Sequence, residues 1–585
     1  MNSRGHRKAF SLQSLQETAP WLGWPVVLID VLTTPARWHA LSERTLDWGS
    51  RVFTFDTTGL ARLLSRLFTL FTPVREALLS RIALLAWIDW KTRKVFWSIM
   101  WALVVLNRSR PKRIPMPREE RMIRVISAPE SYSDFVSPKL QVPANLPSAE
   151  SSLSARAIVQ MLHLSQDVYP IIASHQPLVS WEPQDRLKAS WNWIYRLVRL
   201  SPAWHPDLTQ AARDGNLLGA LATGGPFAKL LECADPIEGT YHINLEHMQK
   251  YDVRPGLKTI GCRIDYRAVN QRLRVNGISY RGMYAAPGGE RWADFERIAL
   301  CSLLTHTTVW RHGMQHHVGG VAPIAAVSHN LPPRHPLRRL LAPFISDTLS
   351  TNYHTHLTLR RSGFDVTGFT FTRQSIYEYY DDGAEAFRMY RMDPRLSIAE
   401  RRIPPALFYP YREQAHRYME LFESYVGTYI GLYYPSEEDL AEDAQARIWY
   451  ESVDAVVRHG IRNLAPKLDR ANLIKLCAVY MYSVSVEHEE NTLWDYGLFL
   501  PATLREDGGM QSAGEVQSSL NFQLVISSAT NRLMKDFSYL ALDSAAAALM
   551  RDFQARLRAL DQDMESRADQ YWNVYPRQLE ASVSA

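Results

Sequence analysis

HGMQHHVGGVAPIAAVSHNLPPRHP, residues 312–336, holds five of the 18 histidines of this 585-residue chain. Two histidines four positions apart on an α-helix lie on one face, so that a helix can offer a metal two nitrogens. His312 and His316 have this spacing. His312 and His317 are separated by about 140° around an α-helix, and they converge only where the helix widens into a π-type turn. Helix geometry leaves the choice between His316 and His317 open.

A third histidine follows an apolar helical run far downstream, in YMYSVSVEHEENTLWDYG (480–497). With the first pair, His488 completes a set of three imidazoles. Three neutral nitrogens with one or two oxygen donors suit iron or manganese that keeps an open position for chemistry. The four cysteines are far apart and form no CxxC pair, which argues against a structural zinc site. The alternative is a set of core or surface histidines without a metal.

The composition is that of a globular protein, with 46% apolar and 11% aromatic residues. Helical patterns dominate, which predicts a mainly α fold with a small β content. We divide the chain into a basic, Trp-rich helical region (1–113), a Pro/Ser-rich linker or surface segment (114–152) and a large domain (153–585). No secretory signal is recognised at the start, so a cytoplasmic location is expected.

The N-terminal region is basic, with 20 Lys/Arg against 9 Asp/Glu in residues 1–124, whereas the whole chain carries +6. Its longest apolar run, VFWSIMWALVVL (95–106), is 12 residues long, and a membrane span needs about 20. A helix lying at a membrane surface is one interpretation, and a buried helix packing on the main domain is the other. The region has no zinc-finger spacing or nucleic-acid reader motif, so no nucleic acid partner is expected.

Four separated motifs, in the right order, resemble the lipoxygenase family. The first is His312-x4-His317-x17-His335-Pro336 with the following LRRLLAPFISDTLSTN (337–352). The others are VGTYIGLYYPSEEDLAEDAQARIWYESV (426–453), SVEH (485–488) and the terminal PRQLEASVSA (576–585). The resemblance covers roughly residues 250–585. It implies a mainly α catalytic domain built around long central helices, of the bacterial type without an N-terminal β-sandwich lipid-targeting domain.

The resemblance implies a ligand set residue by residue. His312 and His317 would be the first two metal ligands, on a helix with a π-type turn, which decides for His317 over His316. His488 would be the third. Thr492 stands where the family has an asparagine ligand, and the terminal carboxylate, usually that of isoleucine, belongs here to Ala585.

The departures from the family make the metal site divergent. Asn491 is one residue out of register with the family's asparagine, and Glu489 and Glu490 replace small alanines. These three and His316 are the alternative ligands or neighbours of the metal, although both glutamates could instead face solvent. Thr355 stands at the family's stereocontrol position, and we expect it to line the substrate pocket together with Leu359.

The resemblance implies a non-haem iron dioxygenase, with manganese as the alternative metal. Such an enzyme abstracts hydrogen from a polyunsaturated lipid or similar long apolar substrate and adds O2 to give a hydroperoxide. Two alternatives keep the fold: an iron-dependent oxidation or rearrangement of a specialised metabolite, and a catalytically inactive lipid-binding protein. The expected partners are O2 and the unsaturated substrate, with peripheral membrane contact through the N-terminal region.

Overall fold

The structure is a computed structural model. It describes residues 113–127, 141–147, 214–318, 321–352, 369–492, 504–506, 532–567 and 574–583, with single gaps at 144 and 226, and scattered positions between 74 and 88. The chain divides into two compact units. The first comprises 1–111, 153–170 and 190–201, and the second comprises 112–152, 171–189 and 202–585. The division of the chain into 1–113, 114–152 and 153–585 stays a prediction.

In the first unit, the described positions between 74 and 88 are mostly helical, and their apolar side chains are exposed, for example Val74, Leu78 and Leu84. The apolar run 95–106 lies outside the described residues. Within the part that is described, no helix has the length and apolar character to cross a membrane. The peripheral membrane contact of this region stays a prediction.

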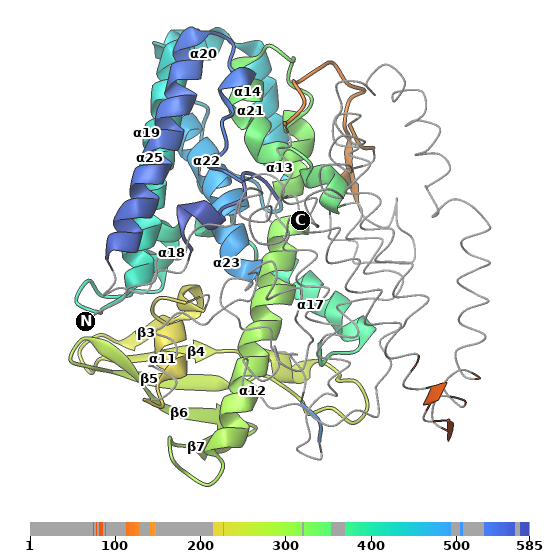
Figure 1. Cartoon of the computed structure of the whole chain (residues 1–585), viewed down its shortest axis with the longest axis vertical. Coiled ribbons are helices and arrows are strands. Elements are labelled where there is room, and N and C mark those ends of the chain that lie inside the picture. Colours follow the sequence, from red (N-terminus) through yellow and green to blue (C-terminus); the bar gives the residue numbers. More distant parts are fainter. Residues whose placement is uncertain are drawn as a thin grey trace, which may run out of the picture. The chain divides into compact units, whose positions relative to one another are not determined.

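The second unit carries an antiparallel five-stranded sheet in the order β3-β4-β5-β6-β7 (Figure 1). Its strands are β3 Glu232–Asp235, β4 Thr240–Asn244, β5 Arg263–Val269, β6 Arg272–Tyr280 and β7 Met283–Ala285. The turn between β5 and β6 has only two residues, Asn270 and Gln271, both with positive φ (51° and 65°). Such a turn matches the twist of paired strands, so that consecutive strands of the meander can pair directly.

Helices make up most of the described part of the second unit, which confirms the predicted mainly α fold with a small β content. The longer ones are α12 Trp292–Thr305, α13 Val321–Ser328, α14 Pro336–Ile345, α17 Arg373–Ala386, α19 Pro410–Tyr433, α21 Ala444–Val456, α22 Arg470–Tyr482 and α25 Ser544–Ser566. Short ones are α11 Leu217–Leu221, α18 Pro394–Glu400, α20 Glu437–Glu442 and α23 His488–Thr492. Three π-helical segments are η4 His306–His312, η5 Met314–Val318 and η7 Ser483–Glu487. The 3₁₀ turns include η2 Ala228–Leu230, η3 Glu246–Lys250, η6 Met389–Met392, η9 Ser538–Leu540 and η10 Pro576–Gln578.

Aspartates begin three of the long helices. Asp443, Asp469 and Asp543 accept hydrogen bonds from first-turn N–H groups of α21, α22 and α25. These bonds satisfy N–H groups that have no partner within the helix. The C-terminal half of α22 is buried on all sides, as expected of a helix at the centre of a large domain. It packs against α19, which also packs against α25.

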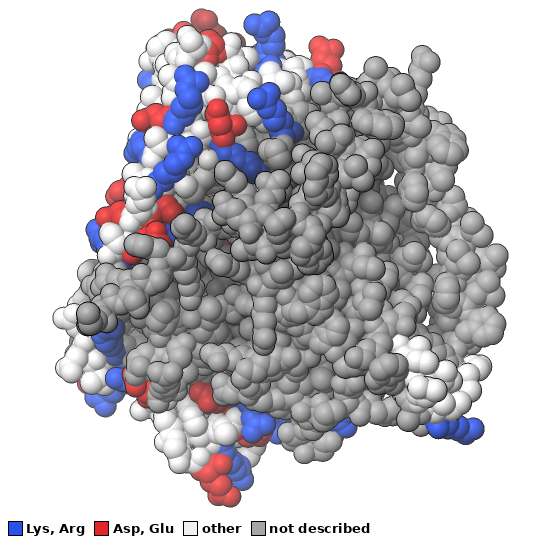
Figure 2. Space-filling model, in the orientation of Figure 1, with Lys and Arg blue, Asp and Glu red and all other residues white. Residues whose placement is uncertain are grey.

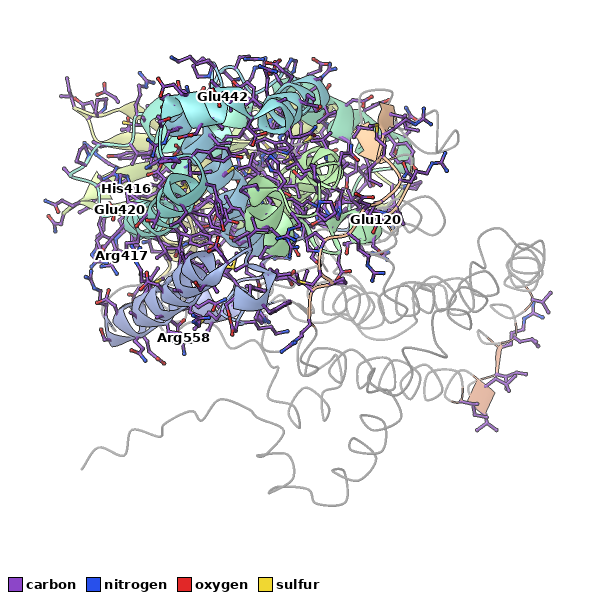
Figure 3. All side chains as sticks on the ribbon, turned by 90° about the horizontal axis from the view of Figure 1, so that it is seen from above. Glu120, His416, Arg417, Glu420, Glu442 and Arg558 are labelled. Carbon is purple, nitrogen blue, oxygen red and sulfur yellow. The ribbon has the colours of Figure 1, made fainter. Side chains whose placement is uncertain are left out.

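The outer face of α19 and α25 is a mixed-charge surface. On the face shown in Figure 2, Lys and Arg side chains are interspersed with Asp and Glu over these helices. Seen from above, His416, Arg417 and Glu420 of α19 and Arg558 of α25 lie at the outer edge of the helical layer (Figure 3). Arg417 bonds to Asp563 of α25. This pattern is typical of solvated helices.

The segment expected to be a linker or surface segment packs against the second unit where it is described. Ile114 and Ile123 are buried. The Ile123 N–H donates to Asn330 Oδ1 at 2.8 Å. Strands β1 Val125–Ser127 and β2 Gln141–Pro143 pair with each other and lie against α13.

Candidate metal centre

Two helices deliver the histidines of the centre, and each changes to π-helical geometry there. Helix α12 continues directly into η4, which ends at His312, and η5 then carries His316. The predicted π-type turn is therefore confirmed. Gly313 joins the two π segments where Tyr380 of α17 approaches, because a Cβ at this position would lie 2.2 Å from Tyr380 Cε1. Only glycine fits there without displacing the tyrosine ring.

The second helix is α22, which continues into η7 and then into α23, whose first residue is His488. The π turn thus directly precedes His488. Such turns are rare and often accompany functional sites.

Three imidazoles meet at the point where these helices cross. Nε2 of His312 lies 2.9 Å from Nε2 of His488 and 3.0 Å from Nε2 of His316, and the remaining pair is 3.1 Å apart. Among the described residues, this is the group of histidine, cysteine and carboxylate side chains whose spacing suits a metal ion. Nitrogens bound to one ion at about 2.1 Å and at right angles to each other would lie about 3.0 Å apart.

Burial favours the neutral form of these rings, and neutral imidazole is the form that binds metal. All three histidines are buried. Desolvation lowers the pKa of His316 to about 4, against a smaller opposing effect of its bond to Asn352. Desolvation lowers the pKa of His488 well below its ordinary value, with smaller contributions from His316 and Lys229.

Asn352 sets the tautomer of His316. Its Nδ2 donates to the Thr348 carbonyl at 2.7 Å, which turns Oδ1 toward His316. Oδ1 lies 3.2 Å from His316 Nδ1 and can only accept, so Nδ1 carries the proton and Nε2 presents a lone pair to the cluster. A hydrogen bond of this kind on the second nitrogen orients metal-binding histidines. The three rings therefore fit a metal ion.

A buried ionic cluster lies beside the histidines. Lys229 Nζ is 3.5 Å from Glu490 and 3.9 Å from Glu487, and Arg311 Nη2 donates to Glu487 at 2.9 Å. Gln414 of α19 also donates to Glu490, at 3.1 Å. Desolvation, partly offset by the two carboxylates, lowers the pKa of Lys229 to about 8. Because Arg311 precedes His312 and Glu487 precedes His488, their bond ties the two ligand segments together.

Neither Glu489 nor Glu490 faces solvent, since both are buried, so the solvent-facing alternative was wrong. Asn491 donates from Nδ2 to Gln315 Oε1 at 2.5 Å, and Gln315 donates to the Ser483 carbonyl at 3.2 Å. Asn491 therefore links α23 by a hydrogen bond to the segment between His312 and His316.

The described cluster contains His316, whereas the resemblance implied His317 as the second ligand. His316 is directed at the rings of His312 and His488. The choice of His317 stays a prediction. The side chains of His317 and Thr492 lie outside the described part of the chain, as do Ala585, Thr355 and Leu359.

The last described residues of the chain are buried deeply. Leu579, Ala581 and Val583 are fully inaccessible, and Ser582 Oγ donates to the Ser346 carbonyl at 2.6 Å. A buried, hydrogen-bonded tail of this kind is consistent with the predicted terminal motif.

His329 and His335 of the opening stretch form hydrogen bonds away from the cluster. His335 begins α14: its Nδ1 accepts from the Leu337 N–H, and its Nε2 bonds to Asp443 at 3.0 Å. His329 Nδ1 accepts from Arg338 Nη2 at 2.7 Å.

Sequence reasoning missed Lys229, Arg311, Gln315 and Gln414. Lys229 lies 261 positions from Glu490, and no local pattern marks a single lysine at that distance.

No family model matches the chain. Among characterised proteins, the linoleate 9/13-lipoxygenase of Pseudomonas aeruginosa is 27% identical over 182 residues, which are 30% of this chain and 26% of that enzyme. The linolenate 9R-lipoxygenase of a Nostoc species is 24% identical over 259 residues, 43% of this chain and 32% of the enzyme. The matched part thus spans between a quarter and a third of each relative.

Among solved structures, coral 8R-lipoxygenase superposes with a TM-score of 0.62 at 13% identity, over 79% of both chains. This chain is a homologue of the lipoxygenases. Manganese lipoxygenase of Gaeumannomyces graminis superposes with a TM-score of 0.58 at 12% identity, over 74% of this chain and 88% of that one. At these identities the structural likeness concerns the fold, and the predicted resemblance to lipoxygenases is confirmed.

Proposed function

We propose that this chain is a lipoxygenase-type dioxygenase whose metal is held by His312, His316 and His488. The observation that carries the proposal is the mutual spacing of three buried Nε2 atoms, 2.9 to 3.1 Å. Three neutral imidazoles whose Nε2 atoms point at one another have too few protons for all three nitrogens to be paired by hydrogen bonds. A cation at that point would accept their lone pairs. Iron is the proposed metal, with manganese as the alternative.

The proposed reaction adds O2 to a carbon of a polyunsaturated lipid, with formation of a hydroperoxide and no other product. When bound, the metal supplies the one-electron oxidation that this chemistry requires. The chain's own contribution is to hold neutral nitrogens in fixed directions and to exclude water. Asn352 holds His316, and the Arg311–Glu487 bond fixes the two ligand segments. The names of the relatives, which act on linoleate or linolenate, support a substrate of this class.

The test combines metal analysis with oxygen uptake. Protein purified without added metal should contain one iron or manganese per chain and consume O2 with linoleate or linolenate. His488→Ala should lose both properties. His416→Ala, an exposed histidine of α19, should retain them. Protein without stoichiometric metal, or metal-loaded protein that consumes no O2 with polyunsaturated lipids, contradicts the proposal.

The divergence at Thr492 favours a second candidate, in which the same centre performs another iron-dependent oxidation or rearrangement. Thr492→Asn distinguishes the two. If the natural chain is inactive on fatty acids and this variant oxygenates them, the second candidate holds. If both behave alike, the substitution does not determine the reaction.

A further inference from the structure

A polar cavity of about 310 Å³ lies between the edge of the sheet and the end of α18. Its walls come from η2, β3, β4, η4 and the segment that follows α18. Five cationic side chains line it, namely Lys229, Arg311, Arg391, Arg401 and Arg402. Glu232 and Glu400 are its only acidic lining residues among those the structure describes. Its lining therefore carries a net charge of +3.

Part of this positive charge is already matched. Arg391 forms a close pair with Glu400, with a shortest distance of 2.6 Å. Lys229 pairs with both Glu487 and Glu490, and Arg311 pairs with Glu487. These pairs leave Arg401 and Arg402 as the lining cations that are available to a further anion.

Arg401 and Arg402 have no carboxylate within ion-pair distance in the described part of the chain. Arg401 Nη1 donates to the carbonyls of Ala228 and Leu231, both at 2.9 Å. Its Nη2 is buried and has no hydrogen-bond partner among the described residues. Arg402 donates to the Cys233 carbonyl at 3.2 Å. Main-chain carbonyls position these guanidinium groups but do not neutralise them.

Arg311 contributes a further unused donor. Its Nη2 bonds to Glu487, whereas its Nε is buried without a hydrogen-bond partner among the described residues. Buried charged donors without acceptors are costly, and negative charge in the adjacent cavity would offset part of that cost for Arg311 and Arg401, which line it.

We propose that this cavity binds a phosphate monoester through Arg401 and Arg402, with Lys229 and Arg311 adding positive charge to its wall. Guanidinium groups match phosphate oxygens in a forked, charge-assisted geometry. A phosphate monoester carries close to two negative charges and three acceptor oxygens, so it can engage cations from different segments at once. The volume exceeds that of a bare phosphate and leaves room for an attached organic group. The bearer of the phosphate is either a small soluble molecule or a lipid headgroup.

The test measures binding directly by calorimetry, on the full chain and irrespective of its metal content or activity. Phenyl phosphate represents a soluble monoester, and vesicles with phosphatidic acid, compared with pure phosphatidylcholine vesicles, represent a lipid headgroup. Benzoate serves as the carboxylate control. The matched variants are Arg402→Gln in the cavity wall and Arg267→Gln, an exposed arginine of β5 outside the cavity.

The proposal predicts saturable binding of phenyl phosphate or of the phosphatidic acid vesicles, and the arm that binds identifies the bearer. Arg402→Gln should weaken that binding about tenfold, as expected for one charge-assisted hydrogen bond, and Arg267→Gln should leave it unchanged. Added salt should weaken it further. Absence of binding in both arms, equal binding of benzoate, or equal effects of the two variants overturns the proposal. Melting curves of both variants verify that they fold.

Discussion

Asp443 holds three helices together with one carboxylate, and its removal should destabilise the second unit strongly. Oδ1 accepts from the N–H groups of Gln445 and Ala446, both at 2.9 Å, and so begins α21. Oδ2 accepts from Tyr434 at 2.7 Å, at the end of α19, and contacts His335 Nε2 at 3.0 Å, at the start of α14. Asp443→Ala removes all of these bonds.

The expected cost of Asp443→Ala is about 4 kcal/mol. A lost N-cap costs about 1 kcal/mol, and each hydrogen bond to an ionised group contributes about 1.5 kcal/mol at the lower end of its range. The lower end applies because the Asp443 side chain is 20% exposed. Asp443→Asn keeps a capping oxygen and should cost about half as much.

The measurement is urea unfolding of the natural chain and the variants, compared through their transition midpoints. Asp469→Ala is the matched control. Asp469 also caps a helix, by accepting from the Asn472 N–H at 2.8 Å, but it does not join other long helices. It should cost about 1 kcal/mol. Equal destabilisation by Asp443→Ala and Asp469→Ala would refute this account of Asp443.

The effect of Asp443→Ala should also depend on pH. Burial alone would raise the pKa of the Asp443 carboxyl, but hydrogen bonds from Ala446, Tyr434 and His335 hold it below its usual value. Because the folded pKa lies below the unfolded value of about 3.9, this stabilisation is complete above that pH and is lost as the pH falls through the folded pKa. The difference between variant and natural chain should therefore shrink in strong acid.

Two further predictions concern the surroundings of the centre. Gly313→Ala forces its Cβ against the Tyr380 ring and should cost about 2 kcal/mol in stability, with reduced metal content. Gly427→Ala places its Cβ in ordinary contact with Ile474 Cδ1, at 3.7 Å, and should be neutral or stabilising. Equal melting temperatures of the two variants would contradict this. Lys229→Met leaves Glu490 buried without its cation and should cost about 3 to 5 kcal/mol. Glu490→Gln should cost less, because Lys229 keeps Glu487 as a partner at 3.9 Å and its pKa is already lowered to about 8. The reverse order in urea unfolding would contradict this.

The histidine pattern made the metal centre predictable in part. His312 and His488 follow from local spacing and from the order of motifs. The π-type turn was predicted for the pair His312 and His317, whereas His312 and His316 share a face even on an ordinary α-helix. The choice between His316 and His317 depends on where the π segments begin and end. Gly313 lies between two π segments and packs closely against Tyr380, 67 positions away, and no helical periodicity encodes such a contact.

The fold was predictable where local signals are strong. Aspartates before apolar helical runs, such as Asp469 and Asp543, do begin long helices. The buried ionic cluster was not predictable, because Lys229 meets Glu487 and Glu490 only after the chain has folded. Two glutamates after a histidine, such as Glu489 and Glu490 after His488, are more typical of a solvated helix end. In the structure both side chains are buried instead.

The most direct test of the central claim compares the metal content of His316→Ala and His317→Ala, purified without added metal. If His312, His316 and His488 hold the metal, His316→Ala loses it and His317→Ala retains about one iron or manganese per chain. Retention in His316→Ala together with loss in His317→Ala would contradict the proposed centre.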